Sequence, residues 1–186
     1  MPGATGVSVR NTPSDGAQRP VPNGIGFVST AQPAACVTAN LTFTSYPRLS
    51  AGATGSTVTA AQCLLKNAGF DPGGANPSGT FDAGTTAATV RFQQARGLAG
   101  TGIVDSHTWT ALLSTGDTPT LRVGSTGYAV TRLQRALTAA LARTVDADGQ
   151  FGPLTEQAVR DYQSGRSLGA DGIVGPLTWA ALQAGR

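Results

Sequence analysis

Residues 148–155 read DGQFGPLT, and residues 171–178 read DGIVGPLT. Each phrase begins with Asp-Gly, which suits a tight turn, and continues with Gly-Pro. Pro fits the first position of a helix, because its backbone angle is already helical and it has no N–H that needs a partner. The phrase therefore predicts a turn followed at once by a helix, and we expect helices to begin near Pro153 and Pro176.

The sequence around these phrases is itself repeated. PRLSAGATGSTVTAAQCLL (47–65) aligns with PTLRVGSTGYAVTRLQRAL (119–137) at an offset of 72 residues, from 47 to 119. Farther along, Trp109 aligns with Trp179 at an offset of 70, because the loop GFDPGGANPSG (69–79) of the first copy is longer. The repetition predicts two tandem units, which we call repeat one (47–115) and repeat two (119–186).

Each repeat is expected to contain three helices. In repeat two, apolar residues recur at helical spacing in three separate stretches. Repeat one has Asp where repeat two has Gly before the second and third helices, and both residue types are accepted at a helix N-cap. The sequence predicts a mainly α fold of two tandem small three-helix bundles. The apolar stretches are Val130, Leu133, Leu137 and Leu141, then Ala158, Val159 and Tyr162, then Trp179 and Leu182.

Residues 1–46 lie outside the repeats and are rich in Pro, Gly, Ser and Thr. This composition is typical of an extended arm or linker. Only VTANLTFTSY (37–46) alternates well enough to predict a short strand. We therefore expect an extended N-terminal arm before the two bundles.

The charge and hydropathy patterns exclude two classes of partner. The net charge is +3 and the pI is about 9.3, but the Arg residues are scattered, so a nucleic-acid-binding stripe is not expected. No apolar run approaches the roughly 18 residues of a membrane span. The N-terminal stretch MPGATGVSVR has no apolar signal core. We expect no membrane-spanning segment and see no signal peptide.

The two cysteines, Cys36 and Cys63, bear on the compartment. An even number of cysteines flanking one segment is typical of a disulfide in an oxidising environment, and two reduced thiols are the alternative. A bridge would tie the arm to the first helix of repeat one. It would place the protein outside a reducing cytoplasm, after trimming of a signal or release by lysis.

The order of motifs resembles a known family. Leu-x-x-Gly-x-x-Gly-x-x-Val-x-x-x-Gln precedes Asp-Gly-x-Phe-Gly-x-x-Thr, an aromatic-Gln pair and Asp-Gly-x-Val-Gly-x-x-Thr-Trp. This order resembles the three-helix peptidoglycan-binding domain of many bacterial and phage cell-wall hydrolases. Repeat two is the closer match. Repeat one has Ser78 and Thr101 where repeat two has Asp148 and Asp171, so we expect repeat one to bind more weakly.

The resemblance implies a non-catalytic module that holds peptidoglycan. A glycan strand with peptide stems offers hydroxyls, amides and carboxylates, so its binding site needs turn amides, short polar side chains and an apolar wall in a shallow groove. The two Asp-Gly turns of repeat two, with polar side chains close to the second turn, are compatible with this. The candidate ligand-binding residues are Asp148, Gly149, Gln163, Arg166, Asp171 and Gly172.

Structural roles compete with these assignments. Asp in Asp-Gly commonly bonds the backbone of its own turn. We expect Gln62 and Gln134, on the first helix of each repeat, to bond a loop backbone. Large apolar residues of the turns and third helices are expected in the cores. These residues are Phe81, Trp109, Phe151, Ile173, Val174 and Trp179.

The residue inventory argues against an enzyme. A zinc amidase or peptidase needs several ligands, and the chain has His107 alone, which we expect at the surface. A Cys-His nucleophile would need a reduced cysteine beside that histidine. A glycosidase needs two opposed carboxylates, and Glu156, the only Glu, is expected on a solvated face. The sequence predicts no catalytic residue, no metal site and no cofactor.

Taken together, the sequence predicts non-catalytic binding of peptidoglycan that targets or anchors a lytic or surface assembly. The expected location is extracellular, at the cell wall or on a virion. The alternative is a structural component of a phage virion or injection-type particle that uses the same fold. In that case the N-terminal arm would be ordered against neighbouring subunits.

Overall fold

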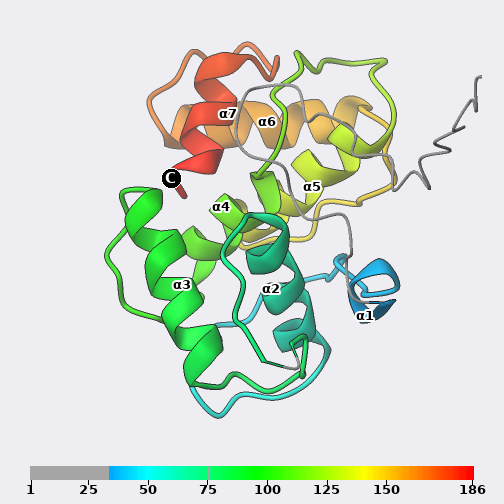
Figure 1. Ribbon diagram of the computed structural model, residues 1–186. Helices are drawn as coiled ribbons and strands as arrows, with labels where there is room; N and C mark the ends of the chain where they lie inside the picture. Colours follow the sequence, from blue (N-terminus) through cyan, green and yellow to red (C-terminus); the bar gives the residue numbers. More distant parts are fainter. Residues whose placement is uncertain (1–33, 75) are drawn as a thin grey trace, which may run out of the picture. The chain divides into compact units, whose positions relative to one another are not determined.

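The computed structural model describes residues 34–74 and 76–186, and in these ranges it is helical without extended strands (Figure 1). The mainly α fold with three helices in each repeat is confirmed. Residues 1–33, which hold most of the predicted arm, lie outside the described residues. The helices are α1 (Ala34–Val37), α2 (Ser56–Asn67), α3 (Ala83–Ala95), α4 (Ser106–Ser114), α5 (Tyr128–Leu141), α6 (Pro153–Gly165) and α7 (Pro176–Gln183).

The helices of repeat two begin where the repeated phrase predicts. α6 and α7 start at Pro153 and Pro176, each after a glycine N-cap. The apolar stripe of α5 is fully buried at Val130, Leu133 and Leu137. Burial of each such side chain contributes about 1.5–3 kcal/mol, so the cores supply most of the folding free energy.

Both repeats are closed by the same long-range contacts. The buried indoles of Trp109 and Trp179 donate their Nε1–H groups to Pro47 O and Pro119 O, each at 2.7 Å. These bonds satisfy the one polar group of each indole, as a buried tryptophan requires. Isolated β-bridges also tie the chain before the first helix to the loops before the later helices. The bridges pair Leu49 with Val104, Thr54 with Thr80, Leu121 with Val174 and Thr126 with Gln150.

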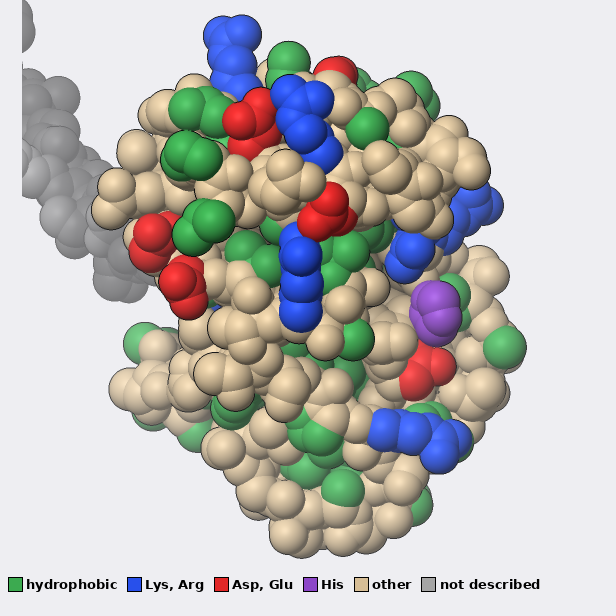
Figure 2. Space-filling model, turned by 180° about the vertical axis from the view of Figure 1, so that it is seen from behind, with side chains coloured by type: hydrophobic (Ala, Val, Ile, Leu, Met, Phe, Trp, Pro, Cys, Tyr) green, Lys and Arg blue, Asp and Glu red, His purple; other side chains and the backbone are tan. Residues whose placement is uncertain are grey.

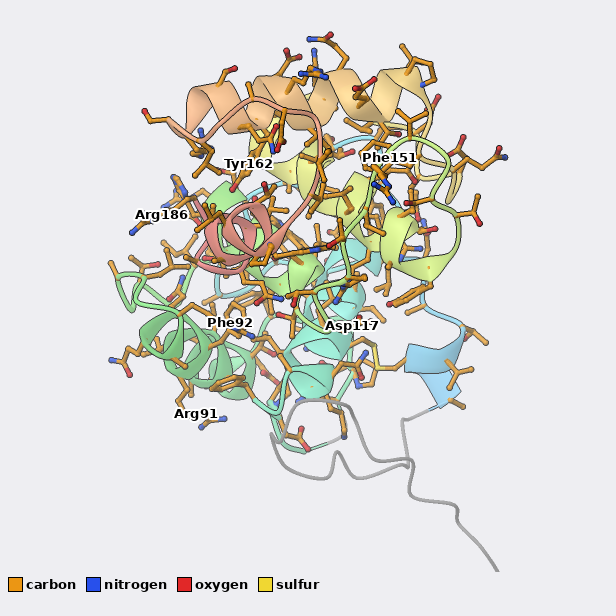
Figure 3. All side chains as sticks on the ribbon, turned by 90° about the horizontal axis from the view of Figure 1, so that it is seen from above. Arg91, Phe92, Asp117, Phe151, Tyr162 and Arg186 are labelled. Carbon is orange, nitrogen blue, oxygen red and sulfur yellow. A yellow bond between two sulfur atoms is a disulfide. The ribbon has the colours of Figure 1, made fainter. Side chains whose placement is uncertain are left out.

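The two repeats pack against each other through α4, which contacts α5 and α7. Arg132 of α5, only 4% exposed, stacks over Trp179 at 4.6 Å and donates from Nη1 to Thr115 O at 2.9 Å. Its guanidinium also pairs with Asp117, labelled in Figure 3, in the short linker (116–118) between the two repeats. The linker is therefore fastened to repeat two by a buried cation.

The segment 38–46 lies against both repeats. Arg135 Nε donates to Thr42 Oγ1 at 2.8 Å, and Thr144 Oγ1 donates to Thr44 O at 2.9 Å. Tyr46 contacts the ring of Trp109, with the centroids 5.1 Å apart. Here the prediction of a strand over 37–46 is wrong. The segment is bent by local bonds and has no neighbouring strand to pair with. These bonds join Thr42 N to Asn40 Oδ1 and Tyr46 OH to Leu41 O.

The disulfide between Cys36 and Cys63 is present, and it joins α1 to α2 as the sequence predicts. Cys63 is 1% exposed, so the bridge is partly protected by the core of repeat one. The segment before repeat one is thus held covalently at one end and by hydrogen bonds further along.

The surface of the described part carries no concentrated charge on the face that Figure 2 shows. Lys, Arg, Asp and Glu side chains are spread over that face, with both signs of charge present, and uncharged surface separates most of them (Figure 2). None of the helices within the described ranges has the length and apolarity needed to cross a membrane.

Candidate functional site

Four buried glutamines organise the turns of the two repeats. Each Nε2 donates to a turn carbonyl and to a threonine hydroxyl, and each Oε1 accepts the N–H of the turn glycine. The expectation that Gln62 and Gln134 bond a loop is confirmed. The four glutamines are Gln62, Gln93, Gln134 and Gln163, each 1–2% exposed.

The second turn of repeat two shows this arrangement in full. The two N–H groups of Gln163 Nε2 are shared among three acceptors: Asp171 Oδ1 at 2.9 Å, Ile173 O at 2.9 Å and Thr178 Oγ1 at 3.1 Å. Its Oε1 accepts the N–H of Gly172 at 3.0 Å. One amide therefore joins the end of α6 to the turn and to the first residues of α7.

Glycine is required at the centre of this turn for two reasons. Gly172 has a φ of +75°, a conformation that L side chains rarely adopt. A Cβ atom there would also lie 2.8 Å from the Cγ of Glu156. Gly149 occupies the same place in the first turn, with a φ of +73°. Both glycines are buried and give their N–H groups to glutamines, so they shape the turns.

The two repeats carry their aspartates at different positions relative to the turns and helix starts. In repeat one, Asp82 and Asp105 are helix N-caps, and each accepts the N–H and the hydroxyl of the threonine three residues later. In repeat two the caps are Gly152 and Gly175, which have no side chain to bond the helix end. The carboxylates of repeat two stand instead in the turns.

The turn carboxylates of repeat two are held by their own turns. Asp171 Oδ1 accepts the N–H of Ile173 at 2.9 Å, and Asp148 Oδ1 accepts the N–H of Gln150 at 2.9 Å. These backbone bonds, followed by the glutamine amides, hold the pKa of both carboxyls below the ordinary value of 3.8. Both side chains are exposed, and each accepts its turn N–H and its glutamine N–H at Oδ1.

A pocket of about 270 Å³ opens beside the Asp171 turn. Asp171 stands at the turn, the buried Thr178 lies at the start of α7, and aliphatic side chains make the wall. Ile173 is 38% exposed on this wall, so its predicted place in the core is wrong; only Val174, the next residue, points inward. The lining residues are Gln163, Leu168, Gly169, Asp171, Ile173, Gly175, Pro176, Leu177 and Thr178.

Repeat one has a smaller pocket of about 150 Å³ at the equivalent place. Its lining includes Thr101 and His107 where repeat two has Asp171 and Leu177. The end of repeat two lies at its rim, because His107 Nδ1 and Gly185 O are 2.6 Å apart. A Cβ on Gly185 would lie 3.1 Å from Leu98 Cδ1. The repeat-one pocket is therefore bordered by the neighbouring repeat.

The candidate residues fall into separate groups in the structure. Asp171 lines the pocket, whereas Asp148 and its turn are held by Gln134 and are not part of the lining. Gln163 is 2% exposed, and its amide is fully used by the turn. Arg166 stacks over Tyr162 at 5.2 Å, and Tyr162 OH donates to the carbonyl of Arg186, which lies close by (Figure 3).

Only Gln163 and Asp171 of the lining were sequence candidates; the other seven lining residues were not: Leu168, Gly169, Ile173, Gly175, Pro176, Leu177 and Thr178. Leu177 is 75% exposed at the second position of α7, off the register of the buried Trp179. A large apolar residue on the outer face of a short helix was the signal available in the sequence. The absence of an acid at position 175, where repeat one has Asp105, was a second signal.

Comparison with known proteins agrees with the division of the chain into two repeats. A family described as a peptidoglycan binding domain matches residues 54–112 and 126–182. A solved peptidoglycan-binding protein from Clostridioides difficile, in complex with glutamine hydroxamate, is 41% identical over 36% of this chain, with a TM-score of 0.34. The match spans 41% of that protein's own length. No curated protein matches the chain. Because the family matches both repeats and more than half of the sequence, the chain belongs to the peptidoglycan binding domain family, with one copy of the domain in each repeat.

Proposed function

We propose that this protein binds bacterial cell-wall peptidoglycan without cleaving it, and that repeat two makes the main contact. The observation that carries the proposal is the open pocket at Asp171, within the second of two in-register copies of a peptidoglycan binding domain. The pocket combines an aliphatic wall with few polar groups, which is the usual composition of a small-ligand site. The domain bounds 47–115 and 119–186 are part of this proposal.

Non-catalytic binding is supported by how the reactive residue types are used. Cys36 and Cys63 are joined to each other, so neither offers a thiolate. His107 shares a hydrogen bond with Gly185 O, and Glu156 is paired with Arg160 at 2.9 Å. Within residues 34–74 and 76–186, no three His, Cys, Asp or Glu side chains gather as a metal site.

The role we infer is to target or anchor a lytic or surface assembly at the wall. The repeats are fastened to each other by Arg132 and by α4, so the pair would bring a joined partner to the wall as one unit. The disulfide supports a location outside a reducing cytoplasm, where the wall lies.

The alternative role in a virion or injection-type particle stays a prediction. It required the N-terminal arm to contact neighbouring subunits. Residues 38–46 contact the same chain at Arg135, Thr144 and Trp109, and residues 1–33 lie outside the described residues.

The direct test is co-sedimentation of the pure chain with purified sacculi, together with an assay for released reducing sugar and free amino groups. We expect saturable binding and no release. Asp171→Ala should weaken binding more than Asp148→Ala, because only Asp171 lines the pocket. Thr101→Ala, at the same position in repeat one, is the matched control and should bind as the wild type does. A chain that stays in the supernatant, or that releases soluble fragments, would refute the proposal.

A further inference from the structure

We propose that the pocket of repeat two recognises an uncharged secondary amide with a small apolar substituent. The amide oxygen would accept from the backbone N–H and hydroxyl of Thr178, and the amide N–H would face Asp171. This inference rests on the proposed function, and it names the chemical group that the pocket takes.

The start of α7 has donors that are not used. Gly175, at the N-cap, gives no side-chain bond to the helix end. Pro176 has no N–H, so the first donors pointing out of the helix are those of Leu177 and Thr178. Thr178 is only 3% exposed and lines the pocket, and its hydroxyl accepts from Gln163. Within the described part of the chain, the structure shows no acceptor for the Thr178 hydroxyl proton or its backbone N–H.

Repeat one shows where an acceptor oxygen fits. There Asp105 Oδ1 accepts both the N–H of Thr108 at 2.9 Å and the Thr108 hydroxyl at 3.0 Å. Thr108 and Thr178 occupy equivalent positions, and each hydroxyl accepts from the equivalent glutamine. The protein therefore fills this place with one of its own oxygens in repeat one. In repeat two the same place faces the open pocket.

The charge of the pocket selects a neutral oxygen. Asp171 Oδ1 and Thr178 Oγ1 both bond Gln163 Nε2, at 2.9 and 3.1 Å, so they are no farther apart than the sum of those distances. A ligand carboxylate at Thr178 would lie close to the Asp171 carboxylate and would be repelled. Repeat one avoids the same conflict, because it has Asp105 at the cap and an uncharged Thr101 in the turn. An amide oxygen meets the donors without this cost.

The remaining groups suit the other side of an amide. Asp171 accepts from Gln163 and from Ile173 N at Oδ1, which leaves Oδ2 to accept a ligand N–H. Leu168, Ile173 and Leu177 offer an aliphatic wall for a methyl-sized substituent. A pocket of about 270 Å³ is slightly smaller than the roughly 300–1,000 Å³ of small-ligand sites, so it would hold one group of a larger polymer.

Two parts of peptidoglycan carry this chemistry: the N-acetyl groups of the glycan and the alanyl amides of the peptide stems. Titration of the full chain by NMR separates them, with an N-acetylglucosamine tetramer in one arm and a synthetic stem tetrapeptide amide in the other. We expect one arm to shift the signals of residues 163 and 171–178. A de-N-acetylated tetramer, which carries ammonium groups, should not bind at this pocket. Tighter binding of that amine would show that Asp171 recognises a cation, and would overturn the inference.

A matched pair of variants tests the helix end itself. Gly175→Asn adds a neutral cap to α7, and Gly152→Asn adds the same cap to α6, which does not line the pocket. Neither position has an atom within 4 Å of the new Cβ, and neither has a positive φ, so both variants should fold. We expect Gly175→Asn to lose about tenfold in affinity for sacculi, because the Oδ1 of the new asparagine would accept from the Thr178 donors that the ligand needs. Gly152→Asn should stay within about twofold of wild type.

The outcomes separate this inference from the proposed function. If wild type sediments with sacculi but Gly175→Asn binds equally well, the pocket is not the site and the inference fails while the proposed function stands. If wild type does not sediment at all, the proposed function fails. If neither amide probe shifts the pocket signals at saturating concentration, the inference fails whatever the sacculi show.

Discussion

Replacing Gln163 with Ala should destabilise the protein far more than replacing an exposed glutamine on the same helix. The loss removes the partner of the buried Gly172 N–H, at 3.0 Å, and a bond to the buried Thr178 hydroxyl, at 3.1 Å. A buried donor left without a partner costs about 1–3 kcal/mol, and an ordinary hydrogen bond contributes about 0.5–1.5 kcal/mol. Asp171 and the Ile173 carbonyl are near solvent, and water replaces part of what they lose. The expected cost is therefore about 2–4 kcal/mol.

This cost is measurable against the whole stability of a small protein, which is about 5–15 kcal/mol. For a unit of about 150 residues, each kcal/mol lowers the melting temperature by about 2–4 °C, so we expect a decrease of roughly 4–16 °C. Urea unfolding followed by circular dichroism gives the free energy, and a thermal scan gives the melting temperature. Gln157→Ala is the matched control, because Gln157 is exposed on α6 and bonds only Asp161, at 2.8 Å.

A second variant separates hydrogen bonding from shape. Gln163→Glu keeps the size of the side chain but turns its donor nitrogen into an oxygen that faces Asp171 Oδ1 and Ile173 O. At neutral pH it should be at least as destabilising as Gln163→Ala. The reasoning is refuted if Gln163→Ala costs no more than Gln157→Ala, or if Gln163→Glu is as stable as wild type.

Three further predictions follow from the same structure. Reduction of the disulfide, or Cys36→Ser with Cys63→Ser, should lower the free energy of unfolding by about 3 kcal/mol, because the bridge closes a loop with a sequence separation of 27. The urea midpoint should fall accordingly. Equal midpoints with and without reductant would contradict this. The folded pKa values of Asp148 and Asp171 are lowered, so the stability these carboxylates contribute is present above the ordinary pKa of 3.8 and is lost as the pH falls through the folded values. The double variant Asp148→Asn with Asp171→Asn should flatten this part of a curve of unfolding free energy against pH. An unchanged curve would count against the turn bonds. Gly116→Ala should destabilise the protein by more than about 1 kcal/mol, because the new Cβ would clash with Arg132 Nη1 and because the φ of +135° at this position disfavours any residue but glycine. Amide hydrogen exchange at the linker should therefore become faster. Exchange equal to wild type would show that the linker is not held by Arg132.

Most of the fold could be predicted from the helical spacing of apolar residues and from the glycine and proline residues that start the helices. The Gly-Pro steps placed the starts of α6 and α7, and the offset between copies carried the same elements to repeat one. The predicted strand failed because alternation alone cannot supply a pairing partner, and residues 40–46 bond one another and the repeats. Arg132 of α5 bonds the Thr115 carbonyl just after α4, and repeat one has Ala60 at the equivalent position, so the repeat pattern contained no signal for this contact.

The site was predictable at the level of the turns. Asp171 and Gly172 were identified from Asp-Gly; the structure places Asp171 at a pocket, while Gly172 and Gln163 are buried behind it and bond each other. The pocket wall was missed because Ile173 was assigned inward by its apolar character, although its neighbour Val174 takes the buried position. A side chain's face in an irregular turn depends on backbone angles that composition does not determine.

The most direct test of the account exchanges the position of one carboxylate. Asp171→Thr with Gly175→Asp gives the second turn of repeat two the pattern of repeat one, with Thr101 and Asp105 as the precedent. Asp148→Ser with Gly152→Asp makes the same exchange at the first turn and is the control. Co-sedimentation with sacculi should show that the first pair stays folded but loses most wall binding, while the control binds as wild type does. Full binding by the Asp171→Thr, Gly175→Asp protein would contradict the claim that this pocket holds the wall.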